Sequence, residues 1–329
     1  MVARNQKLKI LYLMDILSRE TDETHGLTLQ EINSRLEAYD IDADRKTLYS
    51  DFSELERYGL DIIKQKDGRT IRYHLVTRTF ELPELKLLVD AVQSSKFITE
   101  NKSRQLIKKL ESFVSKYDAH HLHRQVLIAG RIKAMNESIY YNVDMLHEAI
   151  NADKQIKFQY FQWNIDGKQE LRRHGDFYQI SPWCLMWDDE NYYLVAFDSQ
   201  EQKIKHYRVD KITKMTVTDL PREGKQQFKE FDAAKYTKSV FGMYGGELTR
   251  VTIEGRNEMI GPLIDRFGKD IPIIPLDESH FRIHVDVMAS RHFLGWIIAL
   301  GEGIRIIGPE VLVEQIKAEA RRLSSQYLE

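Results

Sequence analysis

The spacing of the hydrophobic residues changes along this chain, and the change limits the folds that the chain can adopt. Over most of the first 128 residues the apolar side chains recur every three to four residues, the period of amphipathic helices; residues 60–75, where they alternate, are the exception. From residue 155 they alternate in short runs, the period of β-strands. Near residue 248 strands and helices begin to follow one another. We therefore expect an α+β protein of several domains, which agrees with a length of 329 residues.

Three short helices and a hairpin are predicted for the first 78 residues. The helices cover residues 7–19, 28–39 and 44–59; the second begins with the capping-box pattern of Thr28 and Glu31. Asp67-Gly68, between two alternating runs, predicts a two-residue hairpin turn. Three helices and a hairpin are typical of a winged helix-turn-helix domain. In such a domain the second helix of the helix-turn-helix, here the third predicted helix, enters the major groove of duplex DNA.

Cations gather on the third predicted helix and on the hairpin. Because the net charge of the chain is −2, a contact with nucleic acid must come from a local patch of this kind. The alternative is an ordinary solvated face, but the acidic residues of the first 40 positions lie mostly elsewhere, which favours a double-stranded DNA operator as partner. The predicted DNA-binding residues are Arg45, Lys46, Thr47, Tyr49, Ser50, Lys64, Lys66, Arg69 and Arg72.

Two further helices, within residues 81–98 and 100–117, are predicted to form a helical linker. Their charges alternate in sign, which is typical of an exposed or intersubunit helix pair. His120, His121 and His123 follow Asp118 and are candidate metal ligands. We predict no metal site, since no second carboxylate or thiol stands at a suitable spacing.

A helix at 143–153 and five short strands at hairpin spacing are predicted next, and they suggest a small, strongly bent sheet or partial barrel. Residues 221–247 lack a clean period and are interpreted as an irregular linker. The remainder follows the order βαββαβ plus a final helix that starts at Pro309. This order is the ferredoxin-like pattern.

The middle region resembles the WYL family of bacterial regulators, which is named for a Trp-Tyr-Leu tripeptide. Tyr192 stands at the Trp position, while Tyr193 and Leu194 agree with the family. The flanking runs are also similar to the family: Tyr160 on an earlier strand, Ser181-Pro182-Trp183, and Tyr207-Arg208-Val209-Asp210-Lys211-Ile212, with Lys211 where the family has Arg.

This resemblance extends over nearly the whole chain and implies a domain organisation. It implies an Sm-like or SH3-like β fold for the middle domain, homodimers, and ligands that are nucleotides or nucleic-acid fragments. The expected segments are a winged helix-turn-helix at 1–78, a helical linker at 79–139, a WYL sensor domain at 140–220, an irregular linker at 221–247, and a ferredoxin-like extension and dimerisation module at 248–329.

Within the middle domain, Arg208 is the natural anion receptor, because its planar guanidinium binds phosphate oxygens in pairs. Simple alternation places Ile204, His206 and Arg208 on one face of their strand. Tyrosines on neighbouring strands are suited to stack a base, and further cations add charge. In the alternative, Arg208 pairs with Asp210 and the tyrosines are core. The predicted ligand-binding residues are Tyr160, Arg172, Arg173, Ser181, Tyr193, His206 and Arg208.

The function predicted from these patterns is a ligand-responsive transcription regulator. The alternative is an accessory factor that binds RNA or single-stranded DNA (ssDNA) and modulates a CRISPR-type defence nuclease. We expect no enzyme and no cofactor, since the phosphate-loop, HExxH and GxSxG motifs are absent. The single cysteine, Cys184, is expected to pack in a strand. A charged N-terminus and the lack of an apolar run of roughly 18 residues predict a cytoplasmic protein with no membrane partner.

Overall fold

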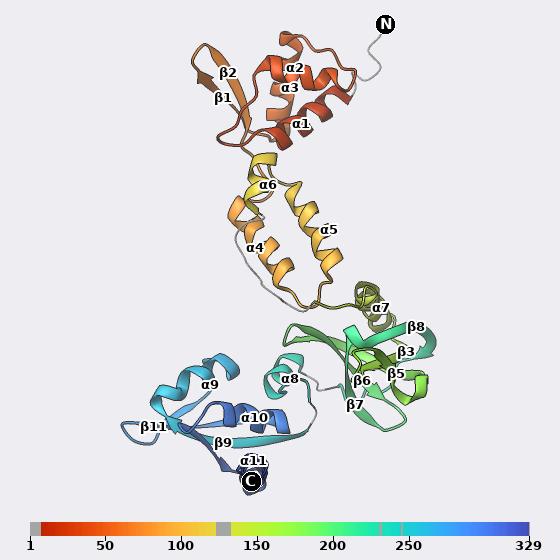
Figure 1. Cartoon of the computed structure of the whole chain (residues 1–329), viewed down its shortest axis with the longest axis vertical. Coiled ribbons are helices and arrows are strands. Elements are labelled where there is room, and N and C mark those ends of the chain that lie inside the picture. The colour runs from red at the N-terminus through yellow and green to blue at the C-terminus, as the bar shows by residue number, and fades with distance from the viewer. Residues whose placement is uncertain (1–7, 123–132, 230–231, 245, 329) are drawn as a thin grey trace. The chain divides into compact units, whose positions relative to one another are not determined.

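The computed structural model describes residues 8–122, 133–229, 232–244 and 246–328 (Figure 1). The chain divides into two compact units, residues 1–135 and 136–329, and each is described by itself. Among the described residues, no helix is long and apolar enough to cross a membrane.

The first unit begins with three helices and a hairpin, as the sequence predicted. The elements are α1 (Lys9–Glu20), α2 (Leu29–Glu37), α3 (Arg45–Tyr58), β1 (Ile62–Asp67) and β2 (Thr70–Leu75). Leu13, Leu17, Ile32, Leu48 and Phe52 form the centre of their shared core. Burial of these side chains fixes the three helices against the hairpin.

Local signals placed two of these helix ends correctly, the start of α2 and the end of α3. At the start of α2, Glu31 donates its backbone N–H to Thr28 Oγ1 and accepts from the Thr28 N–H, so the capping box is present. Gly59 ends α3 with φ 110°, a left-handed value that glycine adopts without strain. The hairpin turn differs by one residue from the prediction. Asp67 pairs with Thr70, so the two-residue loop is 68–69 and Asp67 remains in the strand.

A helical segment follows in the same unit, made of α4 (Leu82–Ser94), α5 (Glu100–Glu111) and α6 (Lys116–Leu122). α4 and α5 lie side by side (Figure 1). Their apolar faces pack through residues such as Leu85, Val89 and Ile107. The predicted single helix over 100–117 is broken before α6. The reason is tertiary: Ser115 Oγ accepts from the Asp118 N–H at 3.1 Å and donates to the buried Asp22 carboxylate at 2.7 Å.

Asp22 is the centre of a junction between the three-helix region and this segment. Its carboxylate also accepts the backbone N–H groups of Thr24 and His25. The His25 ring stacks on Tyr117 with ring centres 3.8 Å apart, and Lys116 pairs with Glu20 at 2.7 Å. The helical segment and the three-helix region are therefore joined by hydrogen bonds, a ring stack and an ion pair, and not only by the connecting chain.

The second unit starts with α7 (Ile139–Asn151) and a six-stranded antiparallel sheet. The strands are β3 (Lys154–Trp163), β4 (Gln169–Leu171), β5 (Tyr178–Asp188), β6 (Asn191–Asp198), β7 (Lys203–Arg208) and β8 (Ile212–Pro221). They are ordered β4-β3-β5-β6-β7, and β8 pairs with β3. The sheet is therefore curled, since β8 follows edge strand β7 in the chain yet pairs near the opposite end.

The sequence predicted five strands here, and the sixth is β4. Residues 170–187, one of the five predicted strands, divide into β4, the short 3-10 turn η2 (Arg172–Gly175) and β5. Arg173 and His174 both have positive φ, 50° and 55°, so the backbone cannot continue as a strand. A second 3-10 turn, η3 (Val209–Lys211), separates β7 from β8.

The C-terminal part has the predicted order of strands and helices. After α8 (Ala233–Ser239), its elements are β9 (Glu247–Arg256), η4 (Asn257–Met259), α9 (Ile260–Phe267), β10 (Ile273–Pro275), β11 (His280–Ala289), α10 (Arg291–Ala299), β12 (Ile304–Gly308) and α11 (Glu310–Tyr327). The sheet order is β10-β11-β9-β12, all antiparallel. Val251, Ile253, Leu263, Ile283 and Phe293 form the centre of the core between sheet and helices.

Candidate functional site

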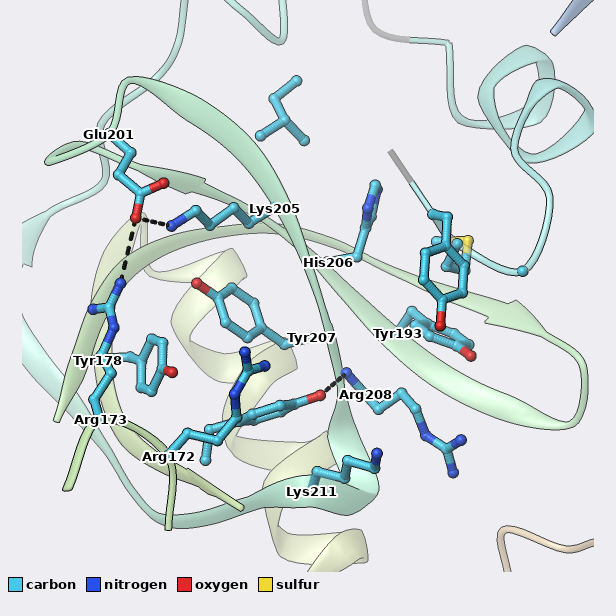
Figure 2. A pocket seen from close by; sticks show the side chains of 15 residues that line it. Arg172, Arg173, Tyr178, Tyr193, Glu201, Lys205, His206, Tyr207, Arg208 and Lys211 are labelled. Atoms are coloured by element: carbon cyan, nitrogen blue, oxygen red, sulfur yellow. Dashed lines mark hydrogen bonds and ion pairs between the residues drawn. The ribbon is translucent and has the colours of Figure 1, made fainter. Parts of the chain in front are cut away.

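A cavity of about 750 Å³ opens beside β7 and is the candidate ligand site (Figure 2). Side chains from β3, η2, β5, β6, β7 and η3 form most of its wall, and three residues after α8 complete it. The lining residues are Tyr160, Arg172, Arg173, Tyr178, Tyr193, Glu201, Ile204, Lys205, His206, Tyr207, Arg208, Lys211, Gly242, Met243 and Tyr244.

Six of the seven residues predicted to bind a ligand lie in this wall: Tyr160, Arg172, Arg173, Tyr193, His206 and Arg208. The seventh, Ser181, does not. Its side chain is fully buried in β5, and its hydroxyl accepts the Glu223 N–H at 2.9 Å. Ser181 therefore fastens the chain after β8 to the sheet. The role of the other six as ligand contacts stays a prediction.

All five residues from Ile204 to Arg208 line the cavity, so the simple division of β7 into two faces does not describe the site. β7 is the last strand of the sheet path and pairs with β6. The cavity wraps around this edge strand, and side chains from both faces reach it. Lys205 and Tyr207 belong to the site for this reason, although alternation assigned them to the opposite face.

Arg208 lies in the wall, but its charge is already compensated. Its Nε and Nη2 donate to the two carboxylate oxygens of Asp210 at 3.0 and 2.9 Å, and Nη2 also donates to Asn191 Oδ1 at 2.9 Å. This ion pair is the alternative that the sequence left open. The backbone N–H of Arg208 donates to Tyr160 Oη at 3.1 Å, which fixes the end of β7 against β3.

Arg173 and Lys205 are compensated as well. Both donate to Glu201 Oε1, at 3.4 and 2.6 Å, as Figure 2 shows. Lys205 also binds Asp198 at 2.7 Å. Burial alone would raise the pKa of the Asp198 carboxyl, but the hydrogen bonds from Lys205 and from two backbone amides hold it below its ordinary value.

Arg172 and Lys211 differ from the other three cations. Neither makes an ion pair with a described residue, and the side chain of Arg172 reaches into the middle of the lining residues (Figure 2). The pKa of Lys211 is lowered, mainly by burial and then by the nearby cations Arg208 and Arg172. Three cations therefore share one part of the wall and only one of them has a carboxylate partner, an arrangement that an anion would stabilise.

His206, one of the predicted ligand-binding residues, does not add positive charge to the site. Burial lowers the pKa of its imidazole to about 4, so the ring is neutral near pH 7. Its Nε2 lies 2.9 Å from the hydroxyl of Tyr236 in α8. His206 therefore links the edge strand to the segment that closes the cavity.

Aromatic rings form the rest of the wall. Tyr160, Tyr178 and Tyr207 pack edge to face, with ring centres 5.6 to 6.1 Å apart. Burial raises the pKa of Tyr160 to about 12, and only 8% of this residue is exposed. Tyr160 is thus mainly core, as the alternative held. Tyr193 is half-buried and Tyr244 is exposed, so these two have more free surface for a ligand.

The second candidate site is the surface of α3 and the hairpin. Asp44 caps α3 by accepting the Thr47 N–H at 2.8 Å. In the first turn, Arg45 donates to Tyr49 Oη at 3.1 to 3.2 Å, and the hydroxyl of the buried Tyr73 lies 3.2 Å from the same oxygen. Lys64 Nζ lies 5.7 Å from the Tyr49 ring centre. Two cations, one from α3 and one from β1, are therefore held beside a single tyrosine.

The other predicted DNA-binding residues fall into two groups. Lys46, Ser50, Lys66 and Arg69 are exposed. The Thr47 hydroxyl donates to the Asp44 carbonyl within the helix cap. Arg72 is half-buried and already has protein partners: its guanidinium binds Asp67 at 3.1 Å, Glu31 at 3.3 Å and the Gly26 carbonyl at 2.9 Å. Its contacts tie the hairpin to the start of α2.

The described residues contain no group of His, Cys, Asp and Glu suited to hold a metal ion. His123, one of the three candidate ligands, lies outside the described residues. Cys184 is half-buried in β5, and burial raises the pKa of its thiol to about 11, so it packs as a neutral side chain.

Comparison with known families identifies the domain that carries the cavity. Residues 141–217 match the WYL domain. Residues 247–324 match the WCX domain, so the expected C-terminal extension has a family match of its own. The predicted resemblance of the middle region is confirmed. For the first 78 residues, the interpretation as a winged helix-turn-helix rests on the three helices and the hairpin.

No curated protein matches the chain. Among solved structures, the chain is similar to the proteasome accessory factor B/C (PafBC) of Arthrobacter aurescens, with 19% sequence identity and a TM-score of 0.26. The match covers 96% of this chain and 46% of that chain, so the present chain spans less than half of its length. A similarity at this level does not define a shared fold.

Sequence reasoning missed several lining residues. Lys211 was noted only as a departure from the family pattern, although it is one of the two lining cations that make no ion pair within the described ranges. Tyr178 lies five residues after Arg173, and the Arg173 guanidinium carbon lies 4.3 Å from the centre of the Tyr178 ring, a cation–π contact. Nothing in the sequence indicated residues 242–244, because they come from a segment without a period that approaches the WYL domain through tertiary contacts.

Proposed function

We propose that the chain is a ligand-responsive, DNA-binding transcription regulator whose WYL domain binds a phosphate-bearing ligand, a nucleotide or a short single strand. The observation that carries this proposal is that Arg172 and Lys211, in a cavity walled by tyrosines, make no ion pair with any residue that the structure describes. The WYL match supports a regulatory role, as the family resemblance implied.

The charges of the cavity favour a phosphate. Five cations line it, and the carboxylates that bind them are Glu201, Asp198 and Asp210. Among the described residues, two positive charges therefore remain in excess of the carboxylates, which matches the charge of a phosphate monoester near pH 7. Hydrogen bonds between a guanidinium or ammonium group and phosphate oxygens are stronger than neutral ones, and more so in a partly desolvated wall.

The shape of the cavity favours an organic phosphate over a free ion. Its volume of about 750 Å³ falls in the range typical of sites for small molecules. Tyr193 and Tyr244 offer ring surface for a base, and stacking on tyrosine tolerates different bases. Such a ligand needs no catalytic group, and we propose no reaction at this site.

In this proposal the N-terminal helices and hairpin bind duplex DNA. The N-terminal side chains of α3 would meet base edges, and the hairpin cations would meet the adjacent phosphates. Arg45 is suited to this role because its hydrogen bonds to Tyr49 orient the guanidinium before binding, and Lys64 brings a second positive charge beside the same ring. Arg72 serves the fold instead, and we assign it no phosphate.

We retain the division into five segments with boundaries at 78, 139, 220 and 247 as part of the proposal. A homodimer also belongs to it, because paired half-sites one helical turn apart are the usual target of a helix-turn-helix protein. The exposed Leu87 on α4, 71% accessible, and the exposed Val311 on α11, 68% accessible, are candidate contacts for a second copy.

Calorimetric titration of the full chain with the 5′-phosphorylated dinucleotide pTpT tests the ligand proposal. We expect the wild type to bind, and the double variant Arg172→Ala, Lys211→Ala to bind at least about 100-fold more weakly, since two charge-assisted contacts are lost. The matched control is Lys168→Ala, Lys203→Ala, which removes the same charge from exposed positions of the same domain. No binding by the wild type, or equal binding by both double variants, would overturn the proposal.

A gel shift separates this function from that of an accessory factor for a defence nuclease. With the promoter of its own gene, a regulator gives discrete binding to a short inverted repeat. A consistent preference for RNA or single strands at the N-terminal region would contradict the regulator and favour the accessory role.

A further inference from the structure

One part of the cavity wall does not come from the WYL domain. Gly242, Met243 and Tyr244 line the cavity, but they lie outside residues 141–217 and precede β9 of the WCX match. They follow α8, whose Tyr236 contacts His206 on the edge strand. The segment 240–244 is called the closing segment here.

The closing segment is fixed from both sides. Phe241 packs in the core of the C-terminal part against Phe267 and Phe293, and the Arg266 guanidinium lies 4.1 Å from its ring centre. Arg266 also donates to the Val240 carbonyl. Met243, two residues after Phe241, packs instead in a cluster with Met186, Val195 and Phe197 of the WYL domain.

Between these anchors the backbone bends sharply over the first turn of α10. Gly242 and Met243 have positive φ values of 59° and 56°. A Cβ added at Gly242 would lie 3.2 Å from His292 Nδ1, so the chain passes directly over this side chain. A left-handed methionine is uncommon and persists only where its surroundings hold it.

This bend places Tyr244 at the cavity, where its ring rests against the ring of His292. The Tyr244 ring stacks on His292 with centres 3.9 Å apart and an angle of 15° between the planes. One face of the tyrosine is thereby covered, yet the residue remains 56% exposed. A second flat ring can still stack on the accessible part of a tyrosine held in this way, and its orientation is set before binding.

We propose that Tyr244, positioned by His292, is the residue that stacks on the base of the ligand whose phosphate Arg172 and Lys211 hold. This inference rests on the proposed function and deepens it. The C-terminal part of the chain then completes the ligand site and makes a contact that exists only when the site is occupied. Tyr244 is a ligand contact, and His292 is a positioning residue that acts through it.

Two probes separate ring recognition from phosphate recognition in the full chain: pTpT, and inorganic pyrophosphate, which has no ring. We expect Tyr244→Ala to weaken pTpT by about 10-fold and to leave pyrophosphate unchanged, because stacking on an aromatic side chain contributes only where a base is present. Tyr244→Phe keeps the ring and should bind both probes as the wild type does. His292→Ala should weaken pTpT by a few-fold.

Tyr327→Ala and His147→Ala are the controls, since both change exposed residues of the same types away from the cavity. Circular dichroism of each variant checks the fold. Wild-type affinity of Tyr244→Ala for pTpT, or an equal loss of pTpT and pyrophosphate, would overturn this inference while leaving the phosphate site in place. If the wild type binds neither probe, the proposed function falls and this inference with it.

Discussion

Because His206 is neutral in the folded chain, the free energy of unfolding of the WYL domain should decrease as the pH falls, by an amount that follows from the pKa of this residue. Its imidazole has a pKa of about 4 in the folded chain against an ordinary value of 6.5, because burial disfavours the charged form. Between these two values the unfolded chain binds a proton that the folded chain does not. Stability is therefore complete above about pH 6.5 and is lost as the pH falls toward 4. Integrated from pH 7.5 to 4.5, the loss from this group is about 2.5 kcal/mol.

The variant His206→Gln isolates this contribution, since an amide does not titrate and still offers hydrogen-bonding atoms to Tyr236. Urea unfolding of both proteins is followed by tryptophan fluorescence, for which Trp163, Trp183 and Trp187 report on the WYL domain. We expect the stability of the wild type relative to the variant to fall by about 2.5 kcal/mol between pH 7.5 and 4.5. Parallel loss of stability in the two proteins would refute the buried, neutral histidine.

Three other predictions concern the remaining parts of the chain. The double variant Arg45→Ala, Lys46→Ala should abolish specific duplex binding in a gel shift, and full operator affinity of this variant would exclude α3 as the recognition helix. Lys66→Ala should weaken binding to all duplexes alike and lower the slope of log affinity against log salt concentration by about one unit. Arg72→Ala should destabilise the fold by about 1 kcal/mol through its lost contact with the Gly26 carbonyl, and an unchanged melting temperature would contradict that role. Light scattering at micromolar concentration should give twice 38.7 kDa, and a mass of 38.7 kDa would contradict the dimer.

Features set by neighbouring residues in the chain were predictable from the sequence. The capping box of Thr28 and Glu31 and the left-handed Gly59 placed two helix ends, since both depend on bonds within one turn. The strands of the WYL domain and the order of the C-terminal elements followed from hydrophobic period and turn residues.

Features set by tertiary contacts were not predictable. The break between α5 and α6 depends on the bond from Ser115 to Asp22, 93 positions away. The division of residues 170–187 into two strands follows from positive φ values at Arg173 and His174. Histidine adopts this conformation more often than most residues, but neither residue type is sufficient to predict it.

The candidate site was predictable in part, for the same reason. The residue types suited to phosphate were found because chemistry depends on the side chain alone. Their charge states were not: Arg208 is compensated by Asp210, and His206 is neutral through burial. Burial and ion pairing are properties of the folded chain, so the sequence alone could not show that Arg172 and Lys211, rather than Arg208, are the candidate phosphate contacts.

The central claim is that a ligand in the WYL domain changes the affinity of the N-terminal region for DNA. The most direct test is the affinity of the full chain for a labelled duplex of its own promoter, by fluorescence anisotropy, with and without saturating pTpT. We predict a change of at least about 5-fold in the wild type, the lower end of usual allosteric coupling, and none in Arg172→Ala, Lys211→Ala. Equal duplex affinity with and without pTpT, under conditions where calorimetry shows that pTpT is bound, would contradict the account.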